Sequence, residues 1–118
     1  MERVTGIGGV FFKAKDPAAL AEWYRANLGI AVEASFGGAI FSATGETVWA
    51  PFPHDSTHFA KPFMINYRVA NLEGMLAQLR AAGAQVDEQV LAESNGKFGW
   101  ATDPEGNRFE LWEPAPAS

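Results

Sequence analysis

One carboxylate occupies an unexpected position near the end of this sequence. Glu110 stands between Phe109 and Leu111, inside an apolar run that is typical of a strand. Because strand residues alternate between the two faces of a sheet, Glu110 shares a face with Arg108 and Trp112 if its two neighbours face a core. A carboxylate on such a face can serve as a general acid or base, as a metal ligand, or as a hydrogen-bond acceptor for a ligand.

Two histidines are the other candidates for chemistry. His54 and His58 are four residues apart in the segment "APFPHDSTHFAKP", where Pro51 and Pro53 favour a loop over a helix. With Glu110 they could form a displaced metal site, or they could gate the entry of a ligand. We favour a third interpretation, in which both are solvated loop residues, and we place ligand gating second and metal binding third.

The elements that must position these residues occur twice along the chain. The first half is predicted to form one strand, one helix and three further strands, at 4–15, 16–29, 30–34, 39–44 and 47–52. The second half is predicted to form the same series, at 63–69, 71–83, 85–91, 97–102 and 107–113. Asp16 and Asn71 are the expected helix caps, and Gly29 and Gly83 the expected helix ends.

This repeated pattern, with the segments "GGVFFKAKDPAALAEWYRANLG" and "DPEGNRFELWEP", resembles the vicinal oxygen chelate superfamily. That superfamily includes glyoxalase I, bleomycin-resistance proteins and extradiol dioxygenases, and the resemblance covers essentially the whole chain. It implies one α+β domain, residues 1–118, built from two βαβββ modules in tandem. The modules, at about 1–53 and about 62–114 with a linker at about 54–61, are expected to form a curved, barrel-like mixed sheet with the helices outside.

The resemblance also assigns four metal-ligand positions, on the first and fourth strands of each module. In this sequence they are occupied by Gly9, Trp49, Met64 and Glu110. Glycine has no side chain, an indole offers only an N–H donor, and a thioether prefers soft ions, so only Glu110 suits a hard or borderline cation. A divalent metal site needs about three or four nitrogen or oxygen ligands, so we predict no metal and no cofactor.

Strand alternation on this fold assigns the remaining side chains to a ligand-binding cup. We predict a largely apolar and aromatic cup with a few polar groups, formed by Gly9, Phe11, Trp49, Met64, Asn66, Arg68, Trp100, Arg108 and Glu110. The sequence does not decide which face of the strand at 97–102 carries the cup. Trp49 and Met64 are equally well interpreted as core filler, and Glu110 as half of an ion pair with Arg68 or Arg108.

Three functions follow from these residues, in order of preference. The first is a protein that binds a small, partly aromatic organic molecule in a metal-free cup, as the bleomycin-resistance branch does. The second is a metal-independent enzyme in which Glu110 is the catalytic general acid or base. The third is a glyoxalase-like, metal-dependent lyase with an atypical ligand set. Whether the protein is an enzyme therefore stays open at this point.

The composition limits the kinds of partner and the cellular location that we expect for the protein. The net charge of −5 argues against a nucleic-acid partner, because phosphate binding favours a basic face. The sequence contains no cysteine, which excludes disulfides and a thiolate nucleophile and suits a cytoplasmic protein. No apolar run is long enough to cross a bilayer, so we expect no membrane partner. The resemblance further implies a homodimer, since short two-module chains of this superfamily commonly pair.

Overall fold

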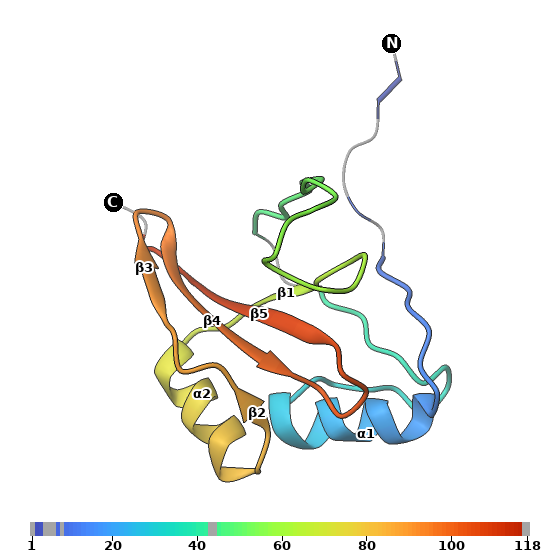
Figure 1. Ribbon diagram of the computed structural model, residues 1–118. Coiled ribbons are helices and arrows are strands. Elements are labelled where there is room, and N and C mark those ends of the chain that lie inside the picture. Colours follow the sequence, from blue (N-terminus) through green and yellow to red (C-terminus); the bar gives the residue numbers. More distant parts are fainter. Residues whose placement is uncertain (1, 4–6, 8, 43–44, 117–118) are drawn as a thin grey trace.

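The computed structural model describes residues 2–3, 7, 9–42 and 45–116, and Figure 1 shows two helices and one sheet among them. The helices are α1 (Pro17–Leu28) and α2 (Leu72–Ala81). The strands are β1 (Asn66–Arg68), β2 (Gln85–Val86), β3 (Leu91–Glu93), β4 (Gly96–Thr102) and β5 (Arg108–Pro114). The predicted α+β class is confirmed. Among the described residues, no helix has the length and apolar character that crossing a membrane requires.

Both helices begin at the residues that the sequence predicts. The Oδ1 atom of Asp16 accepts a hydrogen bond from the backbone N–H of Ala19 at 3.1 Å, and Asn71 accepts one from Gly74 at 3.0 Å. Each cap satisfies a backbone donor that the first helical turn leaves unpaired. Gly29 ends α1 with a φ of 68°, a left-handed conformation that glycine adopts at little cost.

The strands of the second half form one mixed sheet, and the last strand in sequence lies inside it. β5 pairs in parallel with β1 and antiparallel with β4, while β4 also pairs antiparallel with β2 and β3. β2 and β3 together replace the single strand predicted at 85–91. The second half thus contains the predicted helix and strands close to three of the four predicted ones, while the strand at 85–91 is interrupted.

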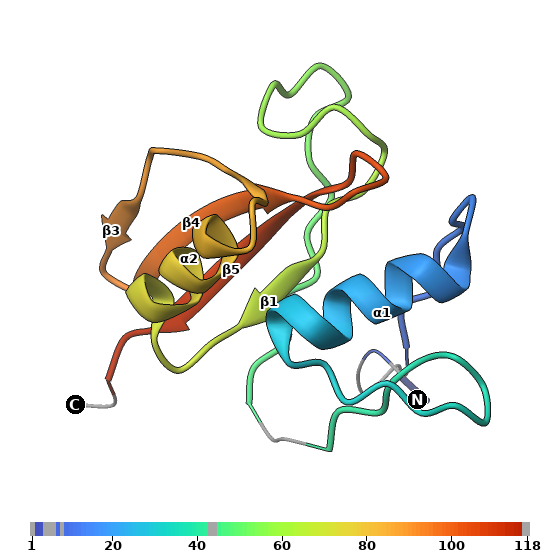
Figure 2. The ribbon, with the colours of Figure 1, turned by 90° about the horizontal axis from the view of Figure 1, so that it is seen from below.

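The core lies between the helices and one face of this sheet, as Figure 2 shows from the helix side. Ala101, Phe109 and Leu111 point from β4 and β5 toward the helices and are at most 1% exposed. They pack against apolar side chains of both helices, namely Leu20, Tyr24, Leu72, Leu76 and Leu79. Because strand side chains alternate, the polar residues between them project from the opposite face.

A buried carboxylate connects the turn before β5 to α1. Asp103 is 4% exposed, and one of its oxygens accepts hydrogen bonds from the Tyr24 hydroxyl at 2.9 Å and from Asn107 Nδ2 at 2.8 Å. Its other oxygen accepts from the backbone N–H groups of Glu105 and Asn107, at 2.9 and 3.0 Å. Four donors therefore surround this one side chain, which makes the turn a rigid support rather than a simple reversal of the chain.

The same turn holds the start of α1. The carboxylate of Glu105 accepts hydrogen bonds from the backbone N–H groups of Lys15 and Asp16, at 2.6 and 2.9 Å. Burial raises the pKa of Tyr24 well above its ordinary value and raises the pKa of Tyr67 to about 12, because a phenolate is costly away from water. Both tyrosines are therefore neutral hydroxyl groups at the helix–sheet boundary.

The first half does not form its predicted strands within the described residues. One antiparallel bridge between Glu33 and Gly38 occurs there, and residues 9–16, 30–42 and 45–53 otherwise run as loops and turns. Positions 4–6, 8 and 43–44 of the predicted strands lie outside the described residues. Short strands are stable only when a neighbouring edge pairs with their backbone groups, and these segments have no such edge in the described chain. The tandem arrangement and the barrel-like sheet are not confirmed, because the described sheet is open and comes from the second half.

Candidate functional site

The face of the sheet opposite the helices, called the open face below, carries the candidate site. The strand register places Trp100 of β4 and Asn66 of β1 on either side of Glu110 in β5. Phe98 and Trp112 form the neighbouring cross-strand pair, and their rings stack with centroids 6.1 Å apart. The register also settles which residues of β4 lie on this face, because Phe98 and Trp100 align with it.

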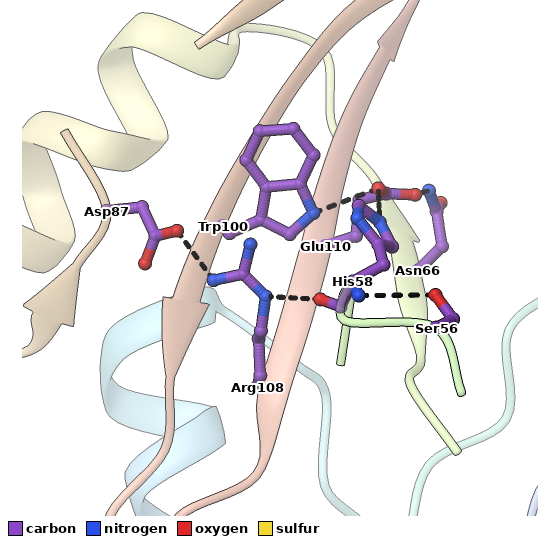
Figure 3. Close-up of polar contacts among 7 residues, drawn as sticks. All are labelled: Ser56, His58, Asn66, Asp87, Trp100, Arg108 and Glu110. Carbon is purple, nitrogen blue, oxygen red and sulfur yellow. Dashed lines mark hydrogen bonds and ion pairs between the residues drawn. The ribbon is translucent and has the colours of Figure 1, made fainter. Parts of the chain in front are cut away.

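Three side chains contact the carboxylate of Glu110 (Figure 3). Its Oε1 accepts a hydrogen bond from Asn66 Nδ2 at 2.7 Å, and its Oε2 accepts one from Trp100 Nε1 at 2.9 Å. The Nε2 atom of His58 lies 3.3 Å from the same Oε2. The Glu110 side chain is 15% exposed, so these neighbours replace most of the water that a carboxylate would otherwise bind. Glu110 is consequently a fixed acceptor and not a freely hydrated charge.

The histidine of this cluster comes from the loop between the two halves. The ring of Phe52 stacks on the imidazole of His58 at 5.7 Å, and Trp100 meets the same imidazole edge-on at 5.6 Å. The His58 side chain is 33% exposed, so it is packed more closely than the solvated loop residue that the sequence suggested. Packing between two aromatic rings, added to the contact with a carboxylate, holds it against the sheet. His54 is exposed, as expected.

A second charged group lies beside the indole of Trp100. The guanidinium carbon of Arg108 is 5.3 Å from the centre of that ring, and its Nη1 donates a hydrogen bond to Asp87 at 2.6 Å. Its Nε donates to the backbone carbonyl of His58 at 3.1 Å. Arg108 therefore supports both the indole and the loop, and Asp87 balances its charge.

The partner of Glu110 differs from the one that the sequence suggested. An ion pair with Arg68 or Arg108 is not found in the described part of the chain. Arg108 pairs with Asp87 instead, and Arg68 donates to the backbone carbonyl of Glu46. Asn66 and Trp100 therefore donate hydrogen bonds to the carboxylate in place of an arginine.

An open cavity of about 470 Å³ lies against Glu110. Its walls combine aromatic rings, carboxylates and small polar groups, from His58, Leu91, Glu93, Ser94, Asn95, Phe98, Trp100 and Glu110. A larger hollow of about 620 Å³ lies beside Arg68 and Trp112 but does not include Glu110. We assign the candidate site to the smaller cavity, because its size suits a small organic molecule and it contains the fixed carboxylate.

The structure brings together part of the predicted site. Asn66, Trp100, Arg108 and Glu110 lie in one cluster. Arg68 is one cross-strand row away, opposite Trp112.

The remaining predicted site residues lie mostly on the surface of the protein. Gly9, Phe11 and Trp49 are exposed, with Trp49 at 77%, and Met64 is half-buried. In the described residues, no ring stacking or hydrogen bond links Trp49 to the Glu110 cluster. The expectation that Trp49 lines the same pocket therefore stays a prediction.

Two residues of the cluster were not selected from the sequence. His58 was considered only as a weak candidate, although its place between Phe52 and Phe59 in a polar loop was a usable signal of burial. Asp87 had no such signal, because it lay inside the strand predicted at 85–91 and nothing in the sequence indicated a partner for it. Its role depends on a pairing with Arg108, 21 residues later, that only the folded chain reveals.

The donors at this site do not fit a resident divalent metal. Glu110 and His58 supply a carboxylate and one imidazole, whereas such an ion needs about three or four ligands. Among residues 2–3, 7, 9–42 and 45–116, no group of three or more His, Cys, Asp or Glu side chains could hold a metal ion.

Comparisons with known proteins agree with the fold of the chain. A family model described as a glyoxalase-like domain matches residues 9–112. No curated protein matches the sequence.

Three solved structures have similar folds. A protein of unknown function from Agrobacterium tumefaciens str. C58 is 17% identical with a TM-score of 0.60, over 92% of this chain and 98% of that one. TnmS3, an antibiotic binding protein from Streptomyces sp. CB03234, is 20% identical with a TM-score of 0.53, over 81% and 84%. The oxidase ChaP-H2 is 16% identical with a TM-score of 0.50, over 89% and 90%. At such identities the likeness shows the fold alone.

Proposed function

We propose that this chain, which belongs to the glyoxalase-like domain family, binds a small, partly aromatic organic molecule on the open face of its sheet. The family match places it in the vicinal oxygen chelate superfamily that its sequence resembles. The observation that carries the proposal is the carboxylate of Glu110, fixed by Asn66 and Trp100 at the wall of an aromatic cavity. The description of TnmS3 as an antibiotic binding protein supports a small-molecule ligand by analogy.

The geometry favours a planar ligand that donates a hydrogen bond. The Oε1 atom of Glu110 accepts one hydrogen bond, from Asn66, and a carboxylate oxygen has room for a second donor. The ring of Phe98 lines the same cavity and offers apolar contact to a flat molecule, while Trp100, which is 3% exposed, fixes the carboxylate at the cavity wall. Binding of this kind needs no metal, in agreement with the incomplete donor set.

The contact between His58 and Glu110 favours a second candidate, a metal-independent enzyme. The two groups are 3.3 Å apart, within reach of a shared proton, and both line the cavity. A carboxylate and an imidazole so placed can act as general acid and base on a bound molecule. A metal-dependent lyase is the least supported candidate, because the described residues contain no group of three or more side chains that could hold the metal.

Titration of the protein with aromatic amines and amides tests the binding proposal. Each compound is paired with an N-methylated form that lacks the N–H, and binding is followed by tryptophan fluorescence and calorimetry. We expect Glu110→Gln to weaken the best ligand at least tenfold, because a hydrogen bond to a charged acceptor contributes about 1.5–3 kcal/mol. Trp100→Phe should reduce both the affinity and the fluorescence change.

Trp23→Phe and Glu22→Gln are the matched controls, because both residues lie on α1 and away from the open face. A saturable ligand whose binding changes in neither Glu110→Gln nor Trp100→Phe would contradict the proposal. Conversion of any compound, lost in His58→Gln while binding persists, would favour the enzyme instead.

A further inference from the structure

The guanidinium of Arg68 has no carboxylate partner within the part of the chain that the structure describes. Arg25 and Arg108, by contrast, each pair with a carboxylate at 2.6 Å. Arg68 lines the hollow of about 620 Å³, where its one hydrogen bond among the described residues goes to the backbone carbonyl of Glu46. A guanidinium carries five N–H donors, so further donors are available to an acceptor that enters this hollow.

The backbone beside this guanidinium has room for it because residue 45 is a glycine. A Cβ atom added at Gly45 would lie 2.9 Å from the Cζ atom of Arg68, which is closer than carbon atoms normally approach. Gly45 also has a φ of 145°, a conformation that residues with a side chain rarely adopt. The glycine and the carbonyl of Glu46 together hold the guanidinium at the wall of the hollow.

A stacked aromatic pair contributes one ring to this hollow and one ring to the candidate site. Trp112 lines the hollow of Arg68, Phe98 lines the cavity of Glu110, and the two rings are within 4° of parallel. Asn95 lines both cavities. Arg68 aligns with Trp112, two residues beyond Glu110 on the same face. At a rise of about 3.3 Å per residue, the two charged positions are about 7 Å apart along the strands.

The charged residues at the two cavities differ. Glu93 and Glu110 line the smaller cavity, whereas Arg68 lines the larger one. Glu46 also lines the larger cavity, but no ion pair joins its carboxylate to Arg68 among the described residues. A molecule that spans both cavities therefore meets hydrogen-bond acceptors at one end and a cationic donor at the other.

We propose that the ligand of this site is a flat aromatic acid with an N–H group at the end opposite its carboxylate. This inference rests on the proposed function and adds the acid to it. Arg68 donates to the carboxylate, Glu110 accepts from the N–H group, and the aromatic ring lies on the stacked pair of Phe98 and Trp112. The planar fork of a guanidinium matches a carboxylate through two parallel hydrogen bonds. A para-substituted benzene ring separates its two groups by about the distance between the two charged positions.

Calorimetric titration with para-aminobenzoate and with its methyl ester tests the proposal. Both probes keep the amine, and only the acid carries a negative charge. We expect the wild type to bind the acid at least tenfold more tightly than the ester, because charge-assisted hydrogen bonds are about twice as strong as neutral ones. Arg68→Gln should lower the affinity for the acid to that for the ester, and should leave the affinity for the ester within twofold of the wild-type value.

Two further variants separate this inference from the proposed function. Arg25→Gln is the matched control, because it removes one positive charge from α1, where Arg25 pairs with Glu22. This control should keep the tenfold preference for the acid. Glu110→Gln should weaken both probes by the same factor, because both carry the amine that the carboxylate binds.

Equal affinity of the wild type for the acid and the ester overturns the inference. So does a preference for the acid that Arg68→Gln leaves intact or that Arg25→Gln also removes. In each of these cases, weaker binding of the ester to Glu110→Gln would still support the proposed function, without a role for an acid. The absence of saturable binding of either probe at millimolar concentration overturns the inference as well.

Discussion

Residues 9–53 and residues 62–114 differ in how much of their apolar surface the molecule covers. In the second half, Phe109 and Leu111 lie in a core that two helices close. In the first half, Phe41 and Trp49 face solvent. The contrast indicates that a helix and a strand satisfy their backbone hydrogen bonds in different ways. A helix satisfies its backbone within its own segment and needs local caps, whereas a strand needs an edge that another segment supplies.

The second half meets that need because β5 has neighbours on both sides. Its register with β1 and β4 pairs each strand with an edge from the same half. The first half contributes α1, which docks on the sheet of the second half through Tyr24 and leaves its own predicted strands without a core. The comparison therefore predicts that substitutions in the two halves will have unequal effects on stability.

The largest difference is expected between two phenylalanine substitutions. Phe109→Ala should lower the free energy of unfolding by about 3–5 kcal/mol, because it leaves a cavity in the closed core. Phe41→Ala should change it by less than about 0.5 kcal/mol, because Phe41 is 69% exposed. Urea unfolding of both variants measures the difference, and equal losses would show that the halves are equally packed.

Asp103→Ala should have the next largest effect, a loss of about 2–4 kcal/mol. The substitution removes the acceptor of four hydrogen bonds and leaves the Tyr24 hydroxyl and the Asn107 amide buried without it. Chemical unfolding checks the value, with Asp55→Ala in the exposed loop as the control. A loss below about 1 kcal/mol would mean that α1 is not held by this turn.

The smallest effects are expected at the two helix caps, and they should be similar. Asp16→Ala and Asn71→Ala each remove one side-chain acceptor from a first helical turn, at a typical cost of about 1 kcal/mol. Thermal unfolding of both variants under one condition makes the comparison. If only Asn71→Ala destabilised the protein, the helix of the first half would contribute no more to stability than its strands.

Local signals explain the parts of the fold that the sequence predicts well. Asp16 and Asn71 each cap a helix by accepting a hydrogen bond from the residue three positions later. Because both partners of such a bond are close in the sequence, the cap can be predicted from the sequence alone. The alternation in 107–113 places Glu110 on the open face for the same reason, because side-chain direction in a strand depends only on position.

The rest depends on contacts between distant residues. Asn66 and Trp100 meet Glu110 only because β1 and β4 flank β5, and His58 meets it from a loop 52 residues away. The predicted strands of the first half have the same residue pattern as those of the second half. That pattern does not show whether a neighbouring strand is available to pair with them. Those strands are not formed in the described residues, and the placing of Gly9 and Trp49 in the site therefore stays a prediction.

The place of β5 between β1 and β4 has a consequence for how this protein is made. A ribosome adds residues 108–114 after every other strand of the sheet, so β1 and β4 are synthesised before the strand that pairs with both of them. The turn that anchors α1 is also synthesised late, 79 residues after Tyr24. The domain should therefore complete its fold only after β5 leaves the exit tunnel, and until then the apolar side chains of the other strands stay exposed.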